Sequence, residues 1–151
     1  MPDRPTRPNR RTLILGGGAL VLGGATVAAW ATRDRFEGDA MSPGDALAAA
    51  RAGDILLIDI RRPDEWEATG IPEGAAPLDM RRDDFAAALS ALAGAPDRPI
   101  ALICARGVRS DRLSARLTEA GFTRIIDVPE GMLGSSAGPG WLARDLPVVR
   151  P

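Results

Sequence analysis

The feature that most constrains the fold of this chain is a short apolar run that ends in its only cysteine. Residues 100–103 are all apolar and follow Pro99, which has no N–H to donate, so they predict a buried parallel strand. Cys104 lies at the carboxyl end of this strand, Gly107 follows in a short turn, and Ser110 is the expected N-cap of a helix. A strand, a turn and a helix N-terminus bring several backbone N–H groups together. We therefore expect the turn to bind anions and to favour a thiolate at Cys104 over a thiol.

Segments typical of strands and of helices alternate along the chain from residue 42 onward. Buried strands are predicted at residues 55–58, 100–103 and 124–128. Helices are predicted at residues 43–52, 63–69, 83–93 and 110–120. This order indicates an α/β domain with a mainly parallel central sheet and helices on both of its faces. In such sheets ligands bind beyond the carboxyl ends of the strands, where Asp59 and Cys104 both lie.

Local signals set the helix ends and the helix faces. Ser42 is the expected N-cap of the first helix, with Pro43 at its first position and Gly53 after its end. The core-facing residues predicted for the last two helices are Phe85, Leu89 and Leu92 in one, and Leu113, Leu117 and Ala120 in the other. Loops are predicted at residues 70–74 and 130–140. We expect Trp141 and residues 146–149 to pack back onto the core.

The composition excludes several classes of function. The chain has 151 residues, enough for one domain and a tail, and it contains no histidine, no tyrosine and no lysine. The lack of histidine excludes Ser-His-Asp and Cys-His catalysis and His-ligated metal sites, and a single cysteine excludes an internal disulfide and a cysteine-cluster metal site. The net charge is −1, with arginines scattered over an acidic domain, so nucleic-acid binding is not indicated. We expect no metal ion and no cofactor.

The N-terminal residues predict a segment for export. Residues 1–11 are polar, proline-rich and basic, and residues 12–31 form a stretch of twenty residues without a charge. A basic end followed by an apolar stretch is typical of an export segment. The pair Arg10-Arg11 and the residues around it resemble a twin-arginine export signal. Positive charge before the apolar stretch keeps this end in the cytoplasm, which predicts a periplasmic location for the rest of the chain.

Two fates of residues 12–31 remain open. Ala29-Trp30-Ala31 fits an A-x-A cleavage site, and cleavage near Ala31 would release the domain. An uncleaved stretch would be a transmembrane anchor, because about 20 apolar residues suffice to span a bilayer. A third interpretation, a buried helix of a soluble protein, is disfavoured because such a helix would need neither the basic flank nor twenty residues without a charge. The predicted organisation then continues with a linker at residues 32–41 and a domain at residues 42–151.

Two separated motifs carry a resemblance to a known family. The first contains Asp59, Arg61, Glu65 and Trp66. The second runs from residue 104 to residue 110 and reads C-A-R-G-V-R-S. In this order they resemble the rhodanese (sulfurtransferase) domain, with its D-x-R-x-x-x-E-aromatic segment and its active-site loop C-R-x-G-x-R-S. The resemblance covers residues 42–149, although Ala105 stands where the family has arginine and Arg106 comes one position later.

The resemblance implies a sulfurtransferase that works through a persulfide on Cys104. The thiolate attacks the outer sulfur of a small anionic donor such as thiosulfate, sulfite leaves, and cyanide, a thiol or a sulfur-relay partner protein accepts the sulfur. Arg106 and Arg109 are expected to bind the anionic donor. The other substrate-binding positions are Ala105, Gly107, Val108 and Ser110. Without histidine, the thiolate depends on the helix dipole, backbone N–H groups and arginine charge.

Structural roles compete with these catalytic ones. A lone cysteine such as Cys104 is often only a small buried hydrophobic residue. Asp59, Arg61 and Glu65 could form a catalytic acid–base set. We favour a structural role for them, in which Arg61 pairs with Glu65 and Asp59 fixes a loop, because buried charges require partners.

Two other functions fit part of the pattern. Cysteine phosphatases and arsenate reductases share the motif C-x5-R, whose loop surrounds a tetrahedral oxyanion. In this chain Cys104 and Arg109 are one residue closer together, with the spacing C-x4-R. The shorter loop suits a single sulfur atom better than a phosphate. A non-autonomous sulfur carrier or a partner-binding rhodanese module is the second alternative, although inactive members usually lack the cysteine.

Overall fold

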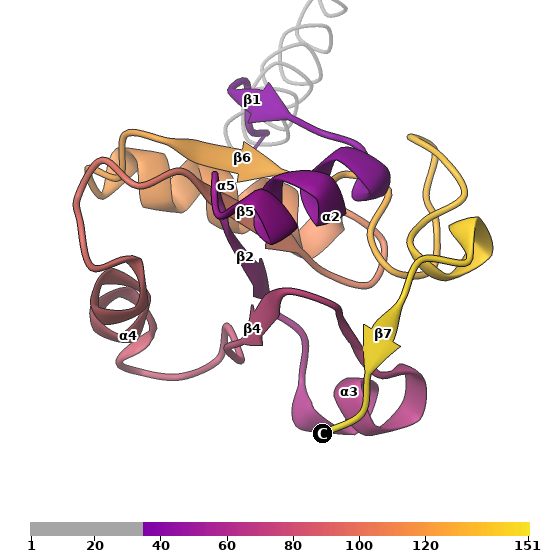
Figure 1. Cartoon of the computed structure of the whole chain (residues 1–151). Coiled ribbons are helices and arrows are strands. Elements are labelled where there is room, and N and C mark those ends of the chain that lie inside the picture. The colour runs from indigo at the N-terminus through magenta and orange to yellow at the C-terminus, as the bar shows by residue number, and fades with distance from the viewer. Residues whose placement is uncertain (1–34) are drawn as a thin grey trace, which may run out of the picture. The chain divides into compact units, whose positions relative to one another are not determined.

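A five-stranded parallel sheet forms the centre of the described part of the chain, residues 35–151 of a computed structural model (Figure 1). The strands lie in the order β1-β6-β5-β2-β4, and every neighbouring pair is parallel. They are β1 (Asp39–Ala40), β2 (Leu56–Asp59), β4 (Ala75–Pro77), β5 (Ile100–Ile103) and β6 (Ile125–Asp127). The predicted α/β class with a mainly parallel sheet is therefore confirmed. The sequence does not predict β1 and β4, because two or three residues are too few to show a hydrophobic pattern.

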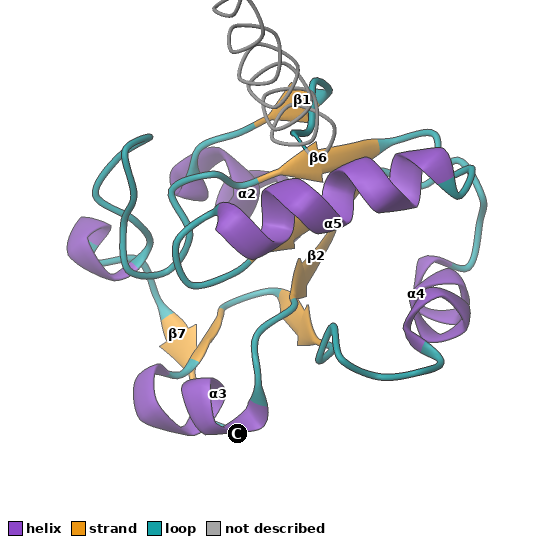
Figure 2. Cartoon of the chain, turned by 180° about the vertical axis from the view of Figure 1, so that it is seen from behind, coloured by secondary structure: helices purple, strands orange, loops and turns teal. Residues whose placement is uncertain are grey.

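Helices flank the sheet on both faces. They are α2 (Pro43–Ala52), α3 (Pro63–Thr69), α4 (Phe85–Ala93) and α5 (Val108–Glu119), with a 3-10 turn, η1 (Leu142–Arg144). Opposite views show α2 on one face of the sheet and α5 on the other (Figure 1, Figure 2). A small antiparallel sheet pairs β3 (Ile71–Pro72) with β7 (Val148–Val149). All four helices begin and end within two residues of their predicted bounds.

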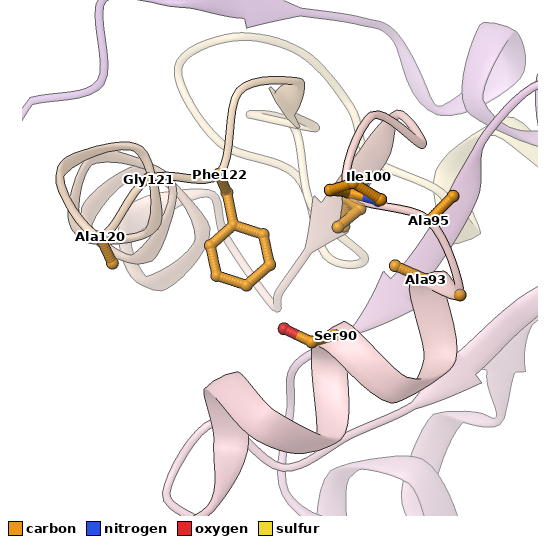
Figure 3. A pocket seen from close by; sticks show the side chains of 9 residues that line it. Ser90, Ala93, Ala95, Ile100, Ala120, Gly121 and Phe122 are labelled. Atoms are coloured by element: carbon orange, nitrogen blue, oxygen red, sulfur yellow. The ribbon is translucent and has the colours of Figure 1, made fainter.

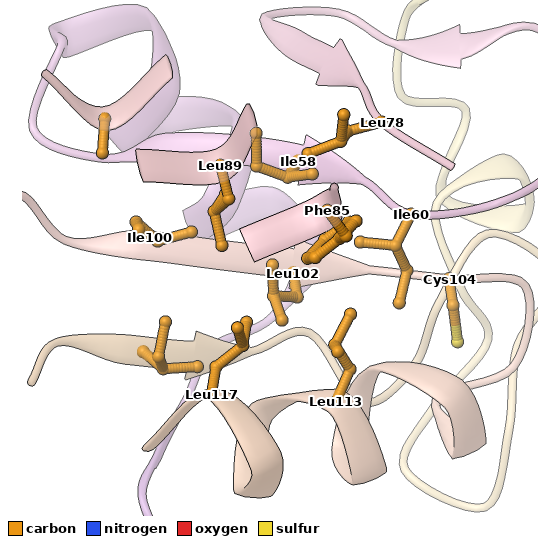
Figure 4. Close-up of a cluster of buried hydrophobic side chains, with 12 residues drawn as sticks. Ile58, Ile60, Leu78, Phe85, Leu89, Ile100, Leu102, Cys104, Leu113 and Leu117 are labelled. Atoms are coloured by element: carbon orange, nitrogen blue, oxygen red, sulfur yellow. The ribbon is translucent and has the colours of Figure 1, made fainter. Parts of the chain in front are cut away.

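Two apolar cores lie on the two faces of the sheet, because successive side chains of a strand point to opposite sides. Ile58 and Leu102 pair in register and pack with residues of α4 and α5 (Figure 4). Leu57 and Ala101, one position earlier, pack with residues of α2. Cys104 belongs to the first core, so the continuation of β5 carries its side chain to the α5 face.

Helix α5 begins at Val108 rather than at Ser110, which corrects the predicted N-cap. Gly107 occupies the N-cap position with a φ of 80°, a left-handed conformation that favours glycine. Ser110 is buried in the first turn, and its hydroxyl donates to the Gly107 carbonyl at 3.1 Å. By contrast, Ser42 caps α2 as predicted, since its hydroxyl oxygen accepts from the Asp45 N–H at 3.2 Å.

The buried faces of α4 and α5 differ from the predicted ones at one position each. In α4, Leu89 and Ala93 are buried one turn apart, whereas Leu92 is 42% exposed. The prediction for Leu92 is therefore wrong, because the contact with the sheet follows a single row of side chains spaced four apart. In α5, both predicted leucines are buried, but Ala120 is exposed because it follows the last helical residue.

The C-terminal segment packs back onto the core as predicted. Trp141 is fully buried in the core on the α2 face. Its indole N–H donates to the Pro147 carbonyl at 3.0 Å. The chain then enters β7, whose pairing with β3 anchors the segment next to α3.

The predicted export or anchor segment, residues 12–31, lies outside the described residues, as does the cleavage site near Ala31. Between residues 35 and 151, no helix is long and apolar enough to cross a membrane. Periplasmic localisation therefore stays a prediction. Part of the predicted linker is structured, since residues 39–40 form β1 against β6.

Alanine substitutions at two leucines of α4 test its core face. Leu89→Ala removes a fully buried side chain, so we expect the free energy of unfolding to fall by about 2–5 kcal/mol. Leu92→Ala is the matched control in the same helix, and it should change that free energy by less than about 1 kcal/mol. Urea unfolding of both variants measures the difference. Equal losses would contradict the packing of α4.

Candidate active site

Cys104 begins a short loop between β5 and α5, which we call the cysteine loop (residues 104–107). A second segment, the supporting loop (residues 128–134), is hydrogen-bonded to it. The Met132 N–H donates to the Cys104 carbonyl at 2.9 Å, and the Leu133 N–H donates to the carbonyl of the next residue at 2.8 Å. Backbone hydrogen bonds therefore fix the position of the loop that carries the cysteine.

Two glycines allow the cysteine loop and the supporting loop to approach this closely. A Cβ atom at Gly131 would lie 2.6 Å from the Ala105 carbonyl oxygen, and one at Gly107 would overlap the Pro129 carbonyl. Both glycines also have positive φ angles, 67° and 80° respectively. Any side chain at either position would push the two loops apart and strain the backbone.

The backbone N–H groups that follow Cys104 are free. Within the described residues, none of the N–H groups of residues 105–110 donates to a protein acceptor. Those of the first helical turn have no intrahelical acceptor, as at every helix N-terminus. Consecutive free donors at the end of β5 can bind an anion and stabilise negative charge on sulfur.

The thiol itself is covered in this conformation. The Cys104 side chain is 1% exposed, and its Sγ donates to the Ser110 hydroxyl oxygen at 3.6 Å. A reagent must therefore displace covering atoms to reach the sulfur. Burial alone would also fit a structural cysteine. The free N–H groups beside it favour a reactive cysteine, because they can stabilise a thiolate.

Arg109 forms a bidentate ion pair with Glu65 of α3, with N–O distances of 2.8 and 2.6 Å. Hydrogen bonding from Arg109, which outweighs desolvation, lowers the pKa of Glu65 to about 2. The pKa of Arg109 is raised, chiefly by its hydrogen bonds to Glu65 and also by the proximity of the Cys104 sulfur. The predicted donor-binding residue Arg109 therefore lies close to Cys104 but already has a carboxylate partner.

Arg61 pairs with Asp59, and the predicted pairing with Glu65 is wrong. The Arg61 Nε donates to Asp59 Oδ1 at 2.9 Å, and its Nη2 donates to Oδ2 at 2.7 Å. The guanidinium also donates to the Thr69 hydroxyl and the Gly70 carbonyl, each at 2.7 Å. Asp59 accepts the Arg61 backbone N–H as well, so it fixes the bend after β2. Both side chains are almost completely buried, which fits a structural role.

Arg106 is the exposed cation of the cysteine loop. Its guanidinium donates to the Gly134 carbonyl at 3.3 Å. Within residues 35–151, no carboxylate lies within ion-pair distance of it. Ala105 is half-buried and Val108 is exposed, so both predicted contact positions border the surface near Arg106. Arg106 is therefore available to an anionic ligand.

The sequence analysis missed Asp127, the last residue of β6. Its carboxyl group is 4% exposed and faces Ser110 of α5. Burial raises the pKa of Asp127 to about 6. Asp127 ends an apolar strand just as Asp59 does. The rule that ligands bind at the carboxyl ends of parallel strands would therefore have singled it out.

A pocket of about 350 Å³ lies at the other end of β5 from Cys104 (Figure 3). Its walls are the end of α4, Ile100 and residues 120–122. Its one polar side chain is Ser90, whose hydroxyl donates to the Ala86 carbonyl. In the described part of the chain, no three His, Cys, Asp or Glu residues are grouped to hold a metal ion. The residues that line this pocket include no cysteine and no charged side chain, in contrast to the loop that begins at Cys104.

Comparisons with known proteins place the chain in a family. The sequence model of the rhodanese-like domain family matches residues 42–137. A sulfurtransferase of Allochromatium vinosum is 29% identical over 98 residues, which cover 65% of this chain and 81% of that protein. The solution structure of the 30 kDa polysulfide-sulfur transferase homodimer from Wolinella succinogenes has a TM-score of 0.64 and 27% identity, covering 85% of this chain and 90% of that one. The crystal structure of Rv0390 from M. tuberculosis has a TM-score of 0.56 and 25% identity, covering 76% and 98%.

The chain belongs to the rhodanese-like domain family, since the family match covers more than half of it. The resemblance predicted from the two motifs is thereby confirmed. The family match and the sulfurtransferase relatives support sulfur transfer as the general class of activity.

Arg61→Ala tests the structural role of the buried ion pair. We expect the free energy of unfolding to fall by about 3–5 kcal/mol, because Asp59 would remain buried without its partner. Arg82→Ala is the matched control, since the pair of Arg82 with Asp84 is exposed and solvent screening leaves such pairs little effect on stability. Urea unfolding measures both changes. A loss no larger for Arg61→Ala than for Arg82→Ala would rule out the structural role.

Proposed function

We propose that the protein is a sulfurtransferase that carries the transferred sulfur as a persulfide on Cys104. A small anionic donor such as thiosulfate supplies the sulfur, and a thiol, cyanide or a sulfur-relay partner protein accepts it. The observation that carries this proposal is the run of free backbone N–H groups at residues 105–110, directly after the only cysteine. The sulfurtransferase relatives from Allochromatium vinosum and Wolinella succinogenes support the same class of reaction.

In the first half-reaction, Sγ of Cys104 attacks the outer sulfur of the donor. A new S–S bond forms while the S–S bond of thiosulfate breaks, and sulfite leaves with the electron pair. In the second half-reaction, the acceptor attacks the outer sulfur of the persulfide and Cys104 leaves as a thiolate. Negative charge stays on sulfur in both steps, where the free N–H groups can stabilise it. Neither step requires an oxidant or a reductant.

The two arginines near Cys104 have different roles in this proposal. Arg106 is exposed and has no carboxylate partner among the residues that the structure describes, so it binds the incoming anion. Arg109 is half-buried beside Cys104, and Glu65 fixes its position. A positive charge held there favours the thiolate and the persulfide anion. Recruitment of the donor and stabilisation of the sulfur anion thus fall to different side chains.

Intact mass spectrometry after treatment with thiosulfate tests the persulfide. We expect the full chain to gain one sulfur, about 32 Da, and to lose it to dithiothreitol, because an activated thiolate attacks the donor. Cys104→Ser is the control and should show no gain. A wild-type mass that stays unchanged, while the thiol still reacts with an alkylating reagent, would contradict autonomous transfer from thiosulfate.

Arg106→Ala tests the binding of the anionic donor. Loss of a charge-assisted hydrogen bond should lower the rate of persulfide formation by about 10- to 100-fold at low thiosulfate concentration. Arg112→Ala is the matched control, because Arg112 is an exposed arginine of α5 without a role in the loop. Stopped-flow measurement of sulfite release gives both rates. Equal rates in the two variants would contradict the role of Arg106.

A further inference from the structure

Three polar side chains meet on the α5 face of the sheet, at the carboxyl ends of β5 and β6. Cys104 Sγ donates to the Ser110 hydroxyl oxygen at 3.6 Å, and this hydroxyl donates to the Gly107 carbonyl at 3.1 Å. Asp127 pairs in register with Leu102, so its side chain points to the same face of the sheet as that leucine. Its carboxyl group lies near the Ser110 hydroxyl, which also accepts from Cys104 Sγ.

Asp127 is a buried acid with an unused acceptor. Within the described residues, its Oδ1 is buried and has no hydrogen-bond partner. Burial disfavours the charged form and raises the pKa of Asp127 to about 6, although the Ser110 hydroxyl opposes the shift. Unsatisfied buried acceptors are uncommon in folded proteins and call for an explanation.

The charged groups around Asp127 do not neutralise it. Asp111 of α5 raises its pKa further by repulsion. Asp39 of β1 is exposed, and Arg109 of α5 is engaged by Glu65. Among residues 35–151, no arginine forms an ion pair with Asp127. The protonation state of this carboxyl can therefore change near neutral pH.

We propose that Asp127 is a positioning residue that accepts the thiol proton of Cys104 through the Ser110 hydroxyl. This inference rests on the proposed function, because it describes how the nucleophile is prepared for attack. The Ser110 hydroxyl turns from the Gly107 carbonyl to Oδ1 of Asp127 and gives its proton to that oxygen. At the same time, the Ser110 oxygen takes the proton of Sγ. The products are a thiolate that accepts a hydrogen bond from Ser110 and a neutral carboxylic acid.

The proton balance closes over the first half-reaction. Before the attack, the thiol of Cys104 holds the proton and Asp127 is a carboxylate. After the attack on thiosulfate, Cys104 is a persulfide anion, sulfite carries two negative charges, and Asp127 holds the proton. The proton then leaves to water or to the departing sulfite. In a chain without histidine, a carboxyl group that titrates near neutrality can take the role of a general base.

The pH dependence of Cys104 reactivity tests this relay. Two rates are measured on the full chain from about pH 4 to pH 9: alkylation by iodoacetamide, and persulfide formation with thiosulfate. In the wild type, both rates should level off above about pH 6 and fall about tenfold per pH unit below it, where Asp127 is already protonated. Asp127→Asn cannot accept a proton, so its rates should show no break near pH 6, rise about tenfold per pH unit through neutral pH as the thiolate forms without a base, and lie about 100-fold below the wild type at about pH 7.

Two further variants complete the test. Asp111→Asn is the matched control, because it removes a neighbouring charge but leaves Asp127, the proton acceptor of the relay, in place. It should keep the break in the pH profile and move it to lower pH, since Asp111 raises the pKa of Asp127. Ser110→Ala breaks the connection between thiol and carboxyl and should behave like Asp127→Asn. Circular dichroism checks that each variant folds. If Asp127→Asn does not fold, the result for Ser110→Ala alone decides whether the relay exists.

The outcomes separate the relay from the proposed function. If the break near pH 6 persists in Ser110→Ala, or in a folded Asp127→Asn, the relay is overturned even where sulfur transfer is observed. If the wild type takes no sulfur from thiosulfate but its alkylation shows the break, and the variants lose it, the relay is supported and transfer from thiosulfate is overturned. Iodoacetamide makes this distinction because its reaction requires the thiolate but no sulfur donor.

Discussion

The active site depends on the close contact between the cysteine loop and the supporting loop. Glycine at positions 107 and 131 lets the two backbones touch, and hydrogen bonds from residues 132 and 133 hold them together. With its carbonyl groups engaged in this way, the cysteine loop leaves its N–H groups at the end of β5 without a partner among residues 35–151. Backbone packing alone therefore presents a row of free donors, before any charged side chain contributes.

Two arginine–carboxylate pairs connect this loop to the rest of the fold. Arg61 and Asp59 form a buried pair at the end of β2, and Arg61 also bonds to residues at the end of α3. These bonds fix α3 and with it Glu65, which holds Arg109 beside Cys104. The segment that contains Asp59, Arg61 and Glu65 thus supports the cysteine loop through these contacts. This dependence explains why both motifs occur together in one domain.

Hydrophobic patterns in the sequence predict the inner strands and the four helices, because long apolar runs and capping residues determine them locally. The short strands β1 and β4 depend on pairing with β6 and β2, which a local pattern does not show. The predicted pair of Arg61 and Glu65 fails for a similar reason. The rule that a buried charge requires a partner does not say which carboxylate supplies it, and the fold brings Asp59 to Arg61 and Glu65 to Arg109.

The residues of the candidate site were predictable to different degrees. Cys104 and the loop after it follow from a strand end, a glycine and a helix start. The N-cap assignment of Ser110 fails because Gly107 adopts the left-handed conformation that starts the helix earlier. The contact between Ser110 and Asp127 joins α5 to β6 and requires the tertiary structure. Local sequence therefore identifies Cys104 and places Asp127 at a strand end, whereas the contact that brings Ser110 and Asp127 together emerges only from packing.

The most direct test of this account is the response of the backbone amides to the persulfide. Two-dimensional ¹H–¹⁵N NMR spectra of the protein are compared before and after loading with a sulfane-sulfur donor. If the free N–H groups stabilise the anionic sulfur, the amide protons of residues 105–110 should shift downfield, and dithiothreitol should reverse the change. Loading on Cys104 without a shift of these amides would contradict the account, because the cysteine loop would then have no part in holding the sulfur.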